Sequence, residues 1–138
     1  MDFKLKDKVI VVTGGSKGIG NGICNLLAKE GAIPVITGRN KPNILDAVKA
    51  IKDNGGQAFH AFAELTDKEA CKKAIDDVIK EFGRIDGLVN NAGVNDGVDL
   101  ENGNYDDFMV SIQRNVAHYY AMAQFALPEL KKSKGAIV

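Results

Sequence analysis

The sequence predicts an α/β fold in which a doubly wound parallel sheet is covered by helices on both faces. Short apolar runs alternate with longer helical patterns along the 138 residues. The first run, Val9–Thr13, is apolar almost throughout, as expected of a strand buried on both faces. A glycine-rich turn joins it to the first helical pattern. Because such alternation forms right-handed crossovers, the expected strand order is 3-2-1-4-5, in one domain spanning residues 1–138.

The first helix and the second strand follow from periodicity and from the residues that interrupt it. Apolar residues spaced at i, i+4, i+7 and i+8 mark one face of a helix: Ile19, Ile23, Leu26 and Leu27. Gly31 is placed to end this helix, because glycine readily adopts the left-handed conformation that follows helix C-termini. Ile33–Thr37 predicts the second strand, with Pro34 near its start, where a missing backbone N–H is best tolerated.

The middle of the chain continues the alternation. Pro42 is suited to open a second helix that Asn54-Gly55-Gly56 ends. The apolar positions of this helix are Ile44, Leu45, Val48 and Ile51. Ala58–Ala63 predicts a weaker third strand, and Thr66-Asp67-Lys68-Glu69 has the form of a capping box at the start of a third helix. The expected buried face of that helix consists of Ala70, Ala74, Ile75, Val78 and Phe82.

The last third of the chain predicts a strand, a loop, a long helix and the start of another strand. Ile85–Asn90 is the fourth apolar run, and Val94–Asn104 is a polar loop. A helix is expected from Asp106 to Lys132, which Pro128 bends or shortens near its end. Gly135–Val138 begins a fifth strand, so the sheet is expected to be truncated at this point.

Composition restricts the partners and the cellular environment. Eighteen basic and eighteen acidic residues give a formal charge of zero, which argues against nucleic acid or an anionic membrane as the partner. No apolar run approaches the roughly 20 residues that a membrane-spanning helix needs. Cys24 and Cys71 lack C-x-x-C spacing, so free buried thiols are favoured over a disulfide or a metal-ligand pair. We expect a cytoplasmic protein without a metal site.

The glycine-rich turn is the first candidate binding site. Gly14, Gly18 and Gly20 lie between the first strand and the first helix, the position at which a dinucleotide-binding (Rossmann-type) fold holds a pyrophosphate. Glycines allow positive φ and a close approach of the backbone to the ligand. The helix N-terminus directs free N–H groups at the negative charge, and Ser16 offers a further hydroxyl donor. The alternative is a turn that binds nothing.

Three motifs together resemble the short-chain dehydrogenase/reductase family. The first is T-G-x-x-x-G-x-G, filled by Thr13-Gly14-Gly15-Ser16-Lys17-Gly18-Ile19-Gly20. The second is Asn90-Asn91-Ala92-Gly93 after the fourth strand, and the third is Asn115 in the long helix. The resemblance implies an NAD(P)-dependent oxidoreductase that transfers hydride between nicotinamide and an alcohol or carbonyl substrate. It also implies that the cofactor is lined by Gly14, Ser16, Lys17, Gly18, Ile19, Gly20, Asn91, Ala92 and Gly93.

The residues after the second and third strands bear on which coenzyme binds. NAD-binding folds usually carry an acidic residue after the second strand, whereas this chain has Thr37-Gly38-Arg39-Asn40. Arg39 is suited to a 2′-phosphate, and Lys17 adds a second positive charge, so NADP is favoured while NAD stays open. The alternative is that both are ordinary surface charges. The family's adenine-binding pair corresponds here to Glu64-Leu65.

Of the family's four catalytic residues, only the asparagine has a counterpart in this chain. In the family it positions a proton-relay water, and here it is Asn115, which is also compatible with a purely structural helical role. No Tyr-x-x-x-Lys occurs, since Tyr105, Tyr119 and Tyr120 lack a lysine four residues later. Tyr119, Tyr120, His60 and His118 are interpreted as packing, structural or surface residues.

The resemblance therefore predicts an amino-terminal fragment that is inactive alone, because the acid/base tyrosine needs a nearby lysine to work near neutral pH. A non-catalytic nucleotide-binding module is the alternative, and a methyltransferase-type Rossmann domain is disfavoured by the spacing of the motifs. The Val94–Asn104 loop has polar residues suited to a hydroxyl-rich substrate. The sequence of this region resembles that of sugar dehydrogenases of the L-fucose type. A sheet that ends at the fifth strand would leave Ile112, Val116 and Tyr119 of the long helix incompletely covered, which predicts poor solubility or self-association of this chain. The family resemblance implies a homo-oligomer of the full-length protein, because in relatives this helix packs between subunits. The physiological substrate and the reaction direction stay open.

Overall fold

The computed structural model describes residues 1–138 and contains one five-stranded sheet in the order β3-β2-β1-β4-β5. All neighbouring strands are parallel, which confirms the predicted fold class and order. The five strands, from amino to carboxyl end, are β1 (Val9–Thr13), β2 (Ile33–Gly38), β3 (Phe59–Phe62), β4 (Gly87–Val89) and β5 (Ala136–Ile137). The fourth strand is shorter than the predicted Ile85–Asn90.

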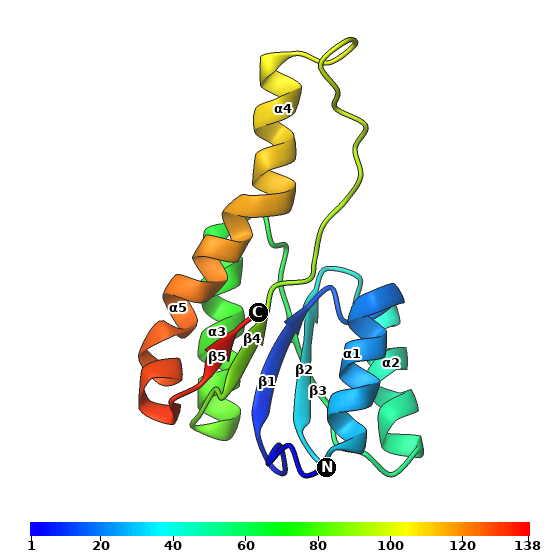
Figure 1. The fold of residues 1–138 in the computed structure, drawn as a ribbon, viewed down its shortest axis with the longest axis vertical. Coiled ribbons are helices and arrows are strands. Elements are labelled where there is room, and N and C mark those ends of the chain that lie inside the picture. Colours follow the sequence, from blue (N-terminus) through cyan, green and yellow to red (C-terminus); the bar gives the residue numbers. More distant parts are fainter.

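Helices cover both faces of the sheet (Figure 1). α1 (Gly18–Lys29) and α2 (Lys41–Asp53) pack on one face, and α3 (Lys68–Phe82) and α5 (His118–Ser133) pack on the other. α4 (Tyr105–Ile112) extends away from the sheet beyond its carboxyl edge, with the 93–104 segment rising beside it (Figure 1). None of these helices combines the length and the apolar character that a membrane-spanning segment requires.

β1 divides its side chains between two apolar cores. Val9 and Val11 belong to the core beneath α3 and α5, whereas Ile10 and Val12 belong to the core beneath α1 and α2. Successive side chains of a strand point to opposite faces, so a continuously apolar strand is required where both faces are covered. Cys24 and Cys71 are free and buried, one in each core, as predicted.

The apolar stripe read from the first helix is only partly buried. Ile19 and Leu26 are 80% and 63% exposed, while Gly20 and Cys24 provide the buried positions of α1. The reason is that α1 lies so close to the glycine turn that only a glycine fits at position 20. In α2, similarly, Ala47 is buried in the core and Leu45 is exposed.

Two predictions about helix ends need correction. The residue that caps α3 is Asp67 rather than Thr66, because the Asp67 carboxylate accepts from the N–H groups of Glu69 (2.9 Å) and Ala70 (3.4 Å). The Thr66 hydroxyl instead donates to Glu64. Pro128 does not shorten the helix as one of the two expected outcomes required, because it lies inside α5, which continues to Ser133.

The long helix predicted from Asp106 to Lys132 is three elements. α4 and α5 are separated by a π-helical turn, η1 (Gln113–Ala117), which contains Asn115. Asn104 caps α4 by accepting from the N–H of Asp107 at 2.9 Å. Such π turns insert an extra residue into the helical ladder and often occur at functional sites. Tyr120, expected to pack, is 71% exposed just beyond this turn.

Candidate functional site

The glycine turn presents a row of free backbone N–H groups. None of the six N–H groups from Gly15 to Gly20 donates to a backbone carbonyl. Lys17 occupies the N-cap position of α1 and makes no side-chain capping bond. Gly14 and Gly18 have φ of +67° and +56°, a region that L side chains rarely adopt. Consecutive unpaired amides at a helix N-terminus form a binding site for an anion such as a diphosphate.

The glycines of this turn have different tasks. A side chain at Gly20 would collide with the Gly14 carbonyl and with the Asn91 amide, so glycine is needed for close packing. A Cβ at Gly18 would meet nothing within 4 Å, so the space beside this residue is open to a ligand. Lys17 and Ile19, which flank Gly18, are both exposed.

Thr13 joins the glycine turn to the Asn-Asn-Ala-Gly segment. Its hydroxyl is fully buried and accepts from the N–H groups of Asn91 and Ala92, both at 3.0 Å. The Asn91 side chain donates back to the carbonyls of Thr13 (3.0 Å) and Gly14 (3.3 Å). Four hydrogen bonds therefore hold Asn91, Ala92 and Gly14 together at the carboxyl edge of β1 and β4. Sequence reasoning placed Thr13 in the motif but gave it no role.

Asn115 connects this edge to the loop through a chain of hydrogen bonds. Its carbonyl oxygen accepts from the Val94 N–H at 2.8 Å, and its amide donates to the carbonyl and the hydroxyl of Ser111, at 3.0 and 3.3 Å. The Ser111 hydroxyl donates to Asp96 at 2.8 Å. Arg114 lies 3.7 Å from the same carboxylate. Gly93 must be small here, because a Cβ would lie 2.9 Å from the Asn115 carbonyl oxygen.

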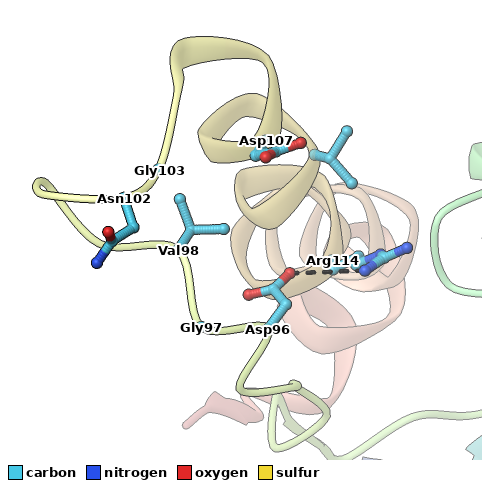
Figure 2. Close-up of a pocket in the computed structure, with 8 residues that line it drawn as sticks. Asp96, Gly97, Val98, Asn102, Gly103, Asp107 and Arg114 are labelled. Atoms are coloured by element: carbon cyan, nitrogen blue, oxygen red, sulfur yellow. Dashed lines mark ion pairs between the residues drawn. The ribbon is translucent and has the colours of Figure 1, made fainter.

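A polar cavity of about 370 Å³ lies between the loop and α4. Figure 2 shows Asp96 paired with Arg114 at one end of it, with Asp107 farther along α4. The cavity is lined by Asp96, Gly97, Val98, Asn102, Gly103, Asp107, Val110 and Arg114. The hydrogen bond from the backbone N–H of Asn102 lowers the pKa of Asp99, burial opposes this effect, and the N–H of Glu101 adds to it, so the pKa lies below its usual value. Asp99 thus shapes the loop, while Asp96 and Asn102 face the cavity.

Arg39 and Glu64 form an ion pair at the same edge of the sheet. The guanidinium Nη1 lies 3.4 Å from Glu64 Oε2, and the Arg39 side chain is 76% exposed. Glu64 also accepts from the Thr66 hydroxyl at 3.1 Å. Burial raises the pKa of Glu64, but the hydrogen bonds from Thr66 and Arg39 outweigh it and lower the pKa below its usual value. Leu65 is half-buried against the core beneath α3 and α5.

The two histidines have structural surroundings. His118 is buried, and its Nε2 lies 2.9 Å from the Arg114 carbonyl oxygen in the preceding turn. His60 stacks on both Phe59 and Phe62, with ring centroids 5.1 and 4.6 Å apart. These contacts are compatible with the structural or surface roles expected for both residues.

The site and the fold together define a class of protein that binds a dinucleotide at the carboxyl edge of a parallel sheet. The sequence profile of the short chain dehydrogenase family matches residues 8–138. The chain therefore belongs to the short chain dehydrogenase family.

Individual relatives are similar over almost the whole chain. The 7alpha-hydroxysteroid dehydrogenase of Clostridium sardiniense is 33% identical over 138 residues, which are 98% of this chain and 53% of that protein. A crystal structure of Cj0485 dehydrogenase is 41% identical with a TM-score of 0.92, covering 99% of this chain and 52% of the other. L-Sorbose reductase from Gluconobacter frateurii, solved with NADPH and L-sorbose, is 28% identical with a TM-score of 0.92, covering 99% and 53% of the two chains. The chain spans about half the length of these relatives.

Proposed function

We propose that this chain is the coenzyme-binding part of an NAD(P)-dependent oxidoreductase that acts on an alcohol or carbonyl substrate. The observation that carries the proposal is the run of free N–H groups from Gly15 to Gly20, held against Asn91 and Ala92 by Thr13. A diphosphate would accept these N–H groups at the positive end of the α1 dipole. When bound, the nicotinamide coenzyme supplies or accepts the hydride.

We infer that NADP(H) is the preferred coenzyme and that NAD(H) is also accepted. Arg39 and Lys17 are exposed at the edge where the adenosine ribose would lie, and no carboxylate directly follows β2. A guanidinium binds a phosphate through paired hydrogen bonds. The similar L-sorbose reductase was solved with NADPH. Glu64 and Leu65 are proposed to border the adenine.

We propose that Asn115 contributes to catalysis by holding the reacting edge of the site in place. Both ends of its side-chain amide are engaged, by the Val94 N–H and by Ser111. The side chain thus fixes the turn that follows Gly93 against η1. The positioned proton-relay water that the family resemblance implies would then lie next to a rigid turn.

For the substrate we propose a hydroxyl-rich compound such as a sugar. Supporting this class are the polar loop, in which Asp96 and Asn102 line the cavity, and the similarity to a reductase solved with L-sorbose. Carboxylate and amide oxygens accept hydrogen bonds from hydroxyl groups. Within this class of compounds, we propose a sugar of the L-fucose type as the specific substrate.

Self-association of the full-length protein through α4 and α5 is a further part of the proposal. Large apolar side chains of these helices and of η1 are 40–74% exposed: Tyr105, Phe108, Met109, Val110, Val116, Tyr120 and Leu127. Exposed apolar surface of this kind favours association. For the full-length protein, light scattering coupled to gel filtration is expected to give a molar mass above that of a single chain. A monomeric mass at tens of micromolar would contradict this.

Isothermal titration calorimetry tests the coenzyme proposal. The 138-residue chain, shown to be folded by circular dichroism, is expected to bind NADP⁺ at one saturable site and NAD⁺ more weakly. The same chain is expected to show no dehydrogenase turnover, because it carries no Tyr-x-x-x-Lys. Binding without turnover also fits the non-catalytic module, and turnover by a longer chain that includes such a motif would decide for the enzyme. Folded protein that binds neither coenzyme would contradict the proposal.

A further inference from the structure

The ion pair between Arg39 and Glu64 joins two positions that come from neighbouring strands. β2 and β3 are parallel and paired so that Gly38 lies opposite Phe62. Arg39 directly follows β2, and Glu64 lies two residues beyond the end of β3. Both side chains therefore leave the sheet at its carboxyl edge, where the adenosine end of a coenzyme would lie.

Glu64 is the fixed member of this pair. Its Oε1 accepts from the hydroxyl and the N–H of Thr66, at 3.1 and 3.4 Å, which leaves Oε2 for Arg39. The Glu64 side chain is 45% exposed, compared with 76% for Arg39. Because the partners of Glu64 lower its pKa, the carboxylate is charged at neutral pH. Any group that Arg39 binds must therefore be placed close to a fixed negative charge.

We propose that Glu64 limits the preference of the site for NADP(H) by competing with the 2′-phosphate of this coenzyme for Arg39. The inference rests on the proposed function. A phosphate bound to Arg39 would be repelled by the nearby carboxylate and would have to displace it from the guanidinium. The 2′-hydroxyl of NAD(H) carries no charge and can donate to a carboxylate. Glu64 thus weakens, without reversing, the preference for NADP(H) that Arg39 and Lys17 provide.

This role differs from a contribution to stability or to adenine binding. An exposed ion pair stabilises a fold very little, so loss of the pair alone changes little in the free protein. Any contact of Glu64 with the adenine is common to both coenzymes and cancels in the ratio of their affinities. The ratio of the two dissociation constants therefore isolates the effect on the 2′ position.

Calorimetric titration of wild type and Glu64→Gln with NADP⁺ and NAD⁺ tests the inference. Glutamine keeps an oxygen that can accept from Thr66 and removes the charge. We expect the dissociation constant of NADP⁺ to fall about 3- to 10-fold and that of NAD⁺ to change less than about 2-fold, as for removal of a like charge at partly screened distance. At about 0.5 M salt the NADP⁺ effect is expected to shrink.

Glu69→Gln is the matched control, because Glu69 is an exposed residue in the first turn of α3 and its loss changes the net charge equally. Its coenzyme ratio is expected to equal that of the wild type. A Glu64→Gln ratio equal to that of the wild type, or a parallel loss of affinity for both coenzymes, would overturn this inference alone. Failure of the folded wild type to bind either coenzyme would overturn the proposed function, and this inference with it.

Discussion

The glycine-turn edge and the loop–α4 region lie next to each other but are held together in different ways. At the glycine turn, buried Thr13 and the amide of Asn91 join β1, α1 and the segment after β4. At the loop, the connections run through Ser111 and Asp96, which are both partly buried. α4 has no buried residue. The first region is anchored on a fully buried residue, whereas the second rests on partly buried side chains of the loop and of a helix without a buried residue.

This difference teaches which part of the site the 138 residues can preform by themselves. Buried hydrogen bonds with several partners are costly to break, so the glycine turn should be rigid before any ligand binds. Regions with few buried contacts open locally at low free energy. Substitutions in the two regions should therefore differ in their effects on stability and on local opening.

Gly20→Ala is expected to disrupt the glycine turn most strongly. The new methyl group would collide with the Gly14 carbonyl, so the free energy of unfolding should fall by about 3 kcal/mol and coenzyme binding should be lost. Urea unfolding and calorimetry provide the measurements. Gly22→Ala is the matched control on the same helix, because a Cβ there meets nothing within 4 Å. That control should be neutral or slightly stabilising, and equal effects at both positions would contradict the close packing.

Thr13→Val is expected to lower the free energy of unfolding by about 2 to 3 kcal/mol, because the N–H groups of Asn91 and Ala92 lose their acceptor. Thr37→Val is the natural comparison, since the Thr37 hydroxyl is buried without any hydrogen-bond partner. Removing that hydroxyl should leave the free energy of unfolding unchanged or raise it. Urea denaturation of both variants measures the difference. A larger loss of unfolding free energy for Thr37→Val than for Thr13→Val would contradict the stabilising role of the Thr13 hydroxyl.

Asp86 extends the contrast to the opposite, amino-terminal edge of the sheet. Its side chain is 5% exposed and accepts from the Val9 N–H (2.9 Å) and from Arg84 (2.8 Å). Burial raises the pKa of Asp86, but Arg84, Val9 and Lys8 outweigh burial and lower the pKa below its usual value. A depressed pKa in the folded state contributes stability above the unfolded pKa of about 3.9, and that contribution is lost as pH falls through the folded value.

Asp86→Asn is therefore expected to cost about 1.5 to 3 kcal/mol at pH 7, with a difference from wild type that shrinks below about pH 4. Urea unfolding of both proteins between about pH 2 and pH 7 measures how this difference in unfolding free energy depends on pH. A difference that does not change with pH would show that the charge of Asp86 is unimportant.

Ser111→Ala should have the smallest global effect, below about 1 kcal/mol, because the serine lies in the less buried region. Its effect should be local. The Val94 amide, which donates to Asn115, is expected to exchange with solvent about tenfold faster once Asn115 loses Ser111 as a partner. Hydrogen exchange by NMR detects this, with exposed Gln113→Ala as the control in the same stretch of helix. Unchanged exchange at Val94 would contradict the proposed chain of hydrogen bonds.

The same contrast explains what the sequence could predict. Strand order and the glycine turn follow from local patterns, since β1 is apolar on both faces and Gly14, Gly18 and Gly20 occur in one short segment. The Thr13–Asn91 contact and the Arg39–Glu64 pair join residues 78 and 25 positions apart, which local periodicity does not report. The prediction of which face of α1 is buried was partly wrong for a related reason. Close backbone packing at Gly20, rather than the apolar stripe, fixes the orientation of the helix.

Some local features were also not predicted from the sequence. Ser111 lies four residues before Asn115, the spacing at which helical side chains meet, so its contact had a signal in the sequence. The π turn has no comparable signature, since it depends on where α4 and α5 must lie relative to the sheet. The cap of α3 was misplaced by one residue because Thr66 and Asp67 are both good capping residues.

An NMR titration of isotope-labelled chain with NADP⁺ tests the central claim most directly. Saturable shifts are expected at the amides from Gly15 to Gly20 and at Ala92 and Gly93, with the amides of α3 beyond its first turn unaffected. Folded protein whose glycine-turn amides do not shift, or whose shifts appear only around Asp96 and Arg114, would contradict binding of the coenzyme diphosphate at the α1 N-terminus.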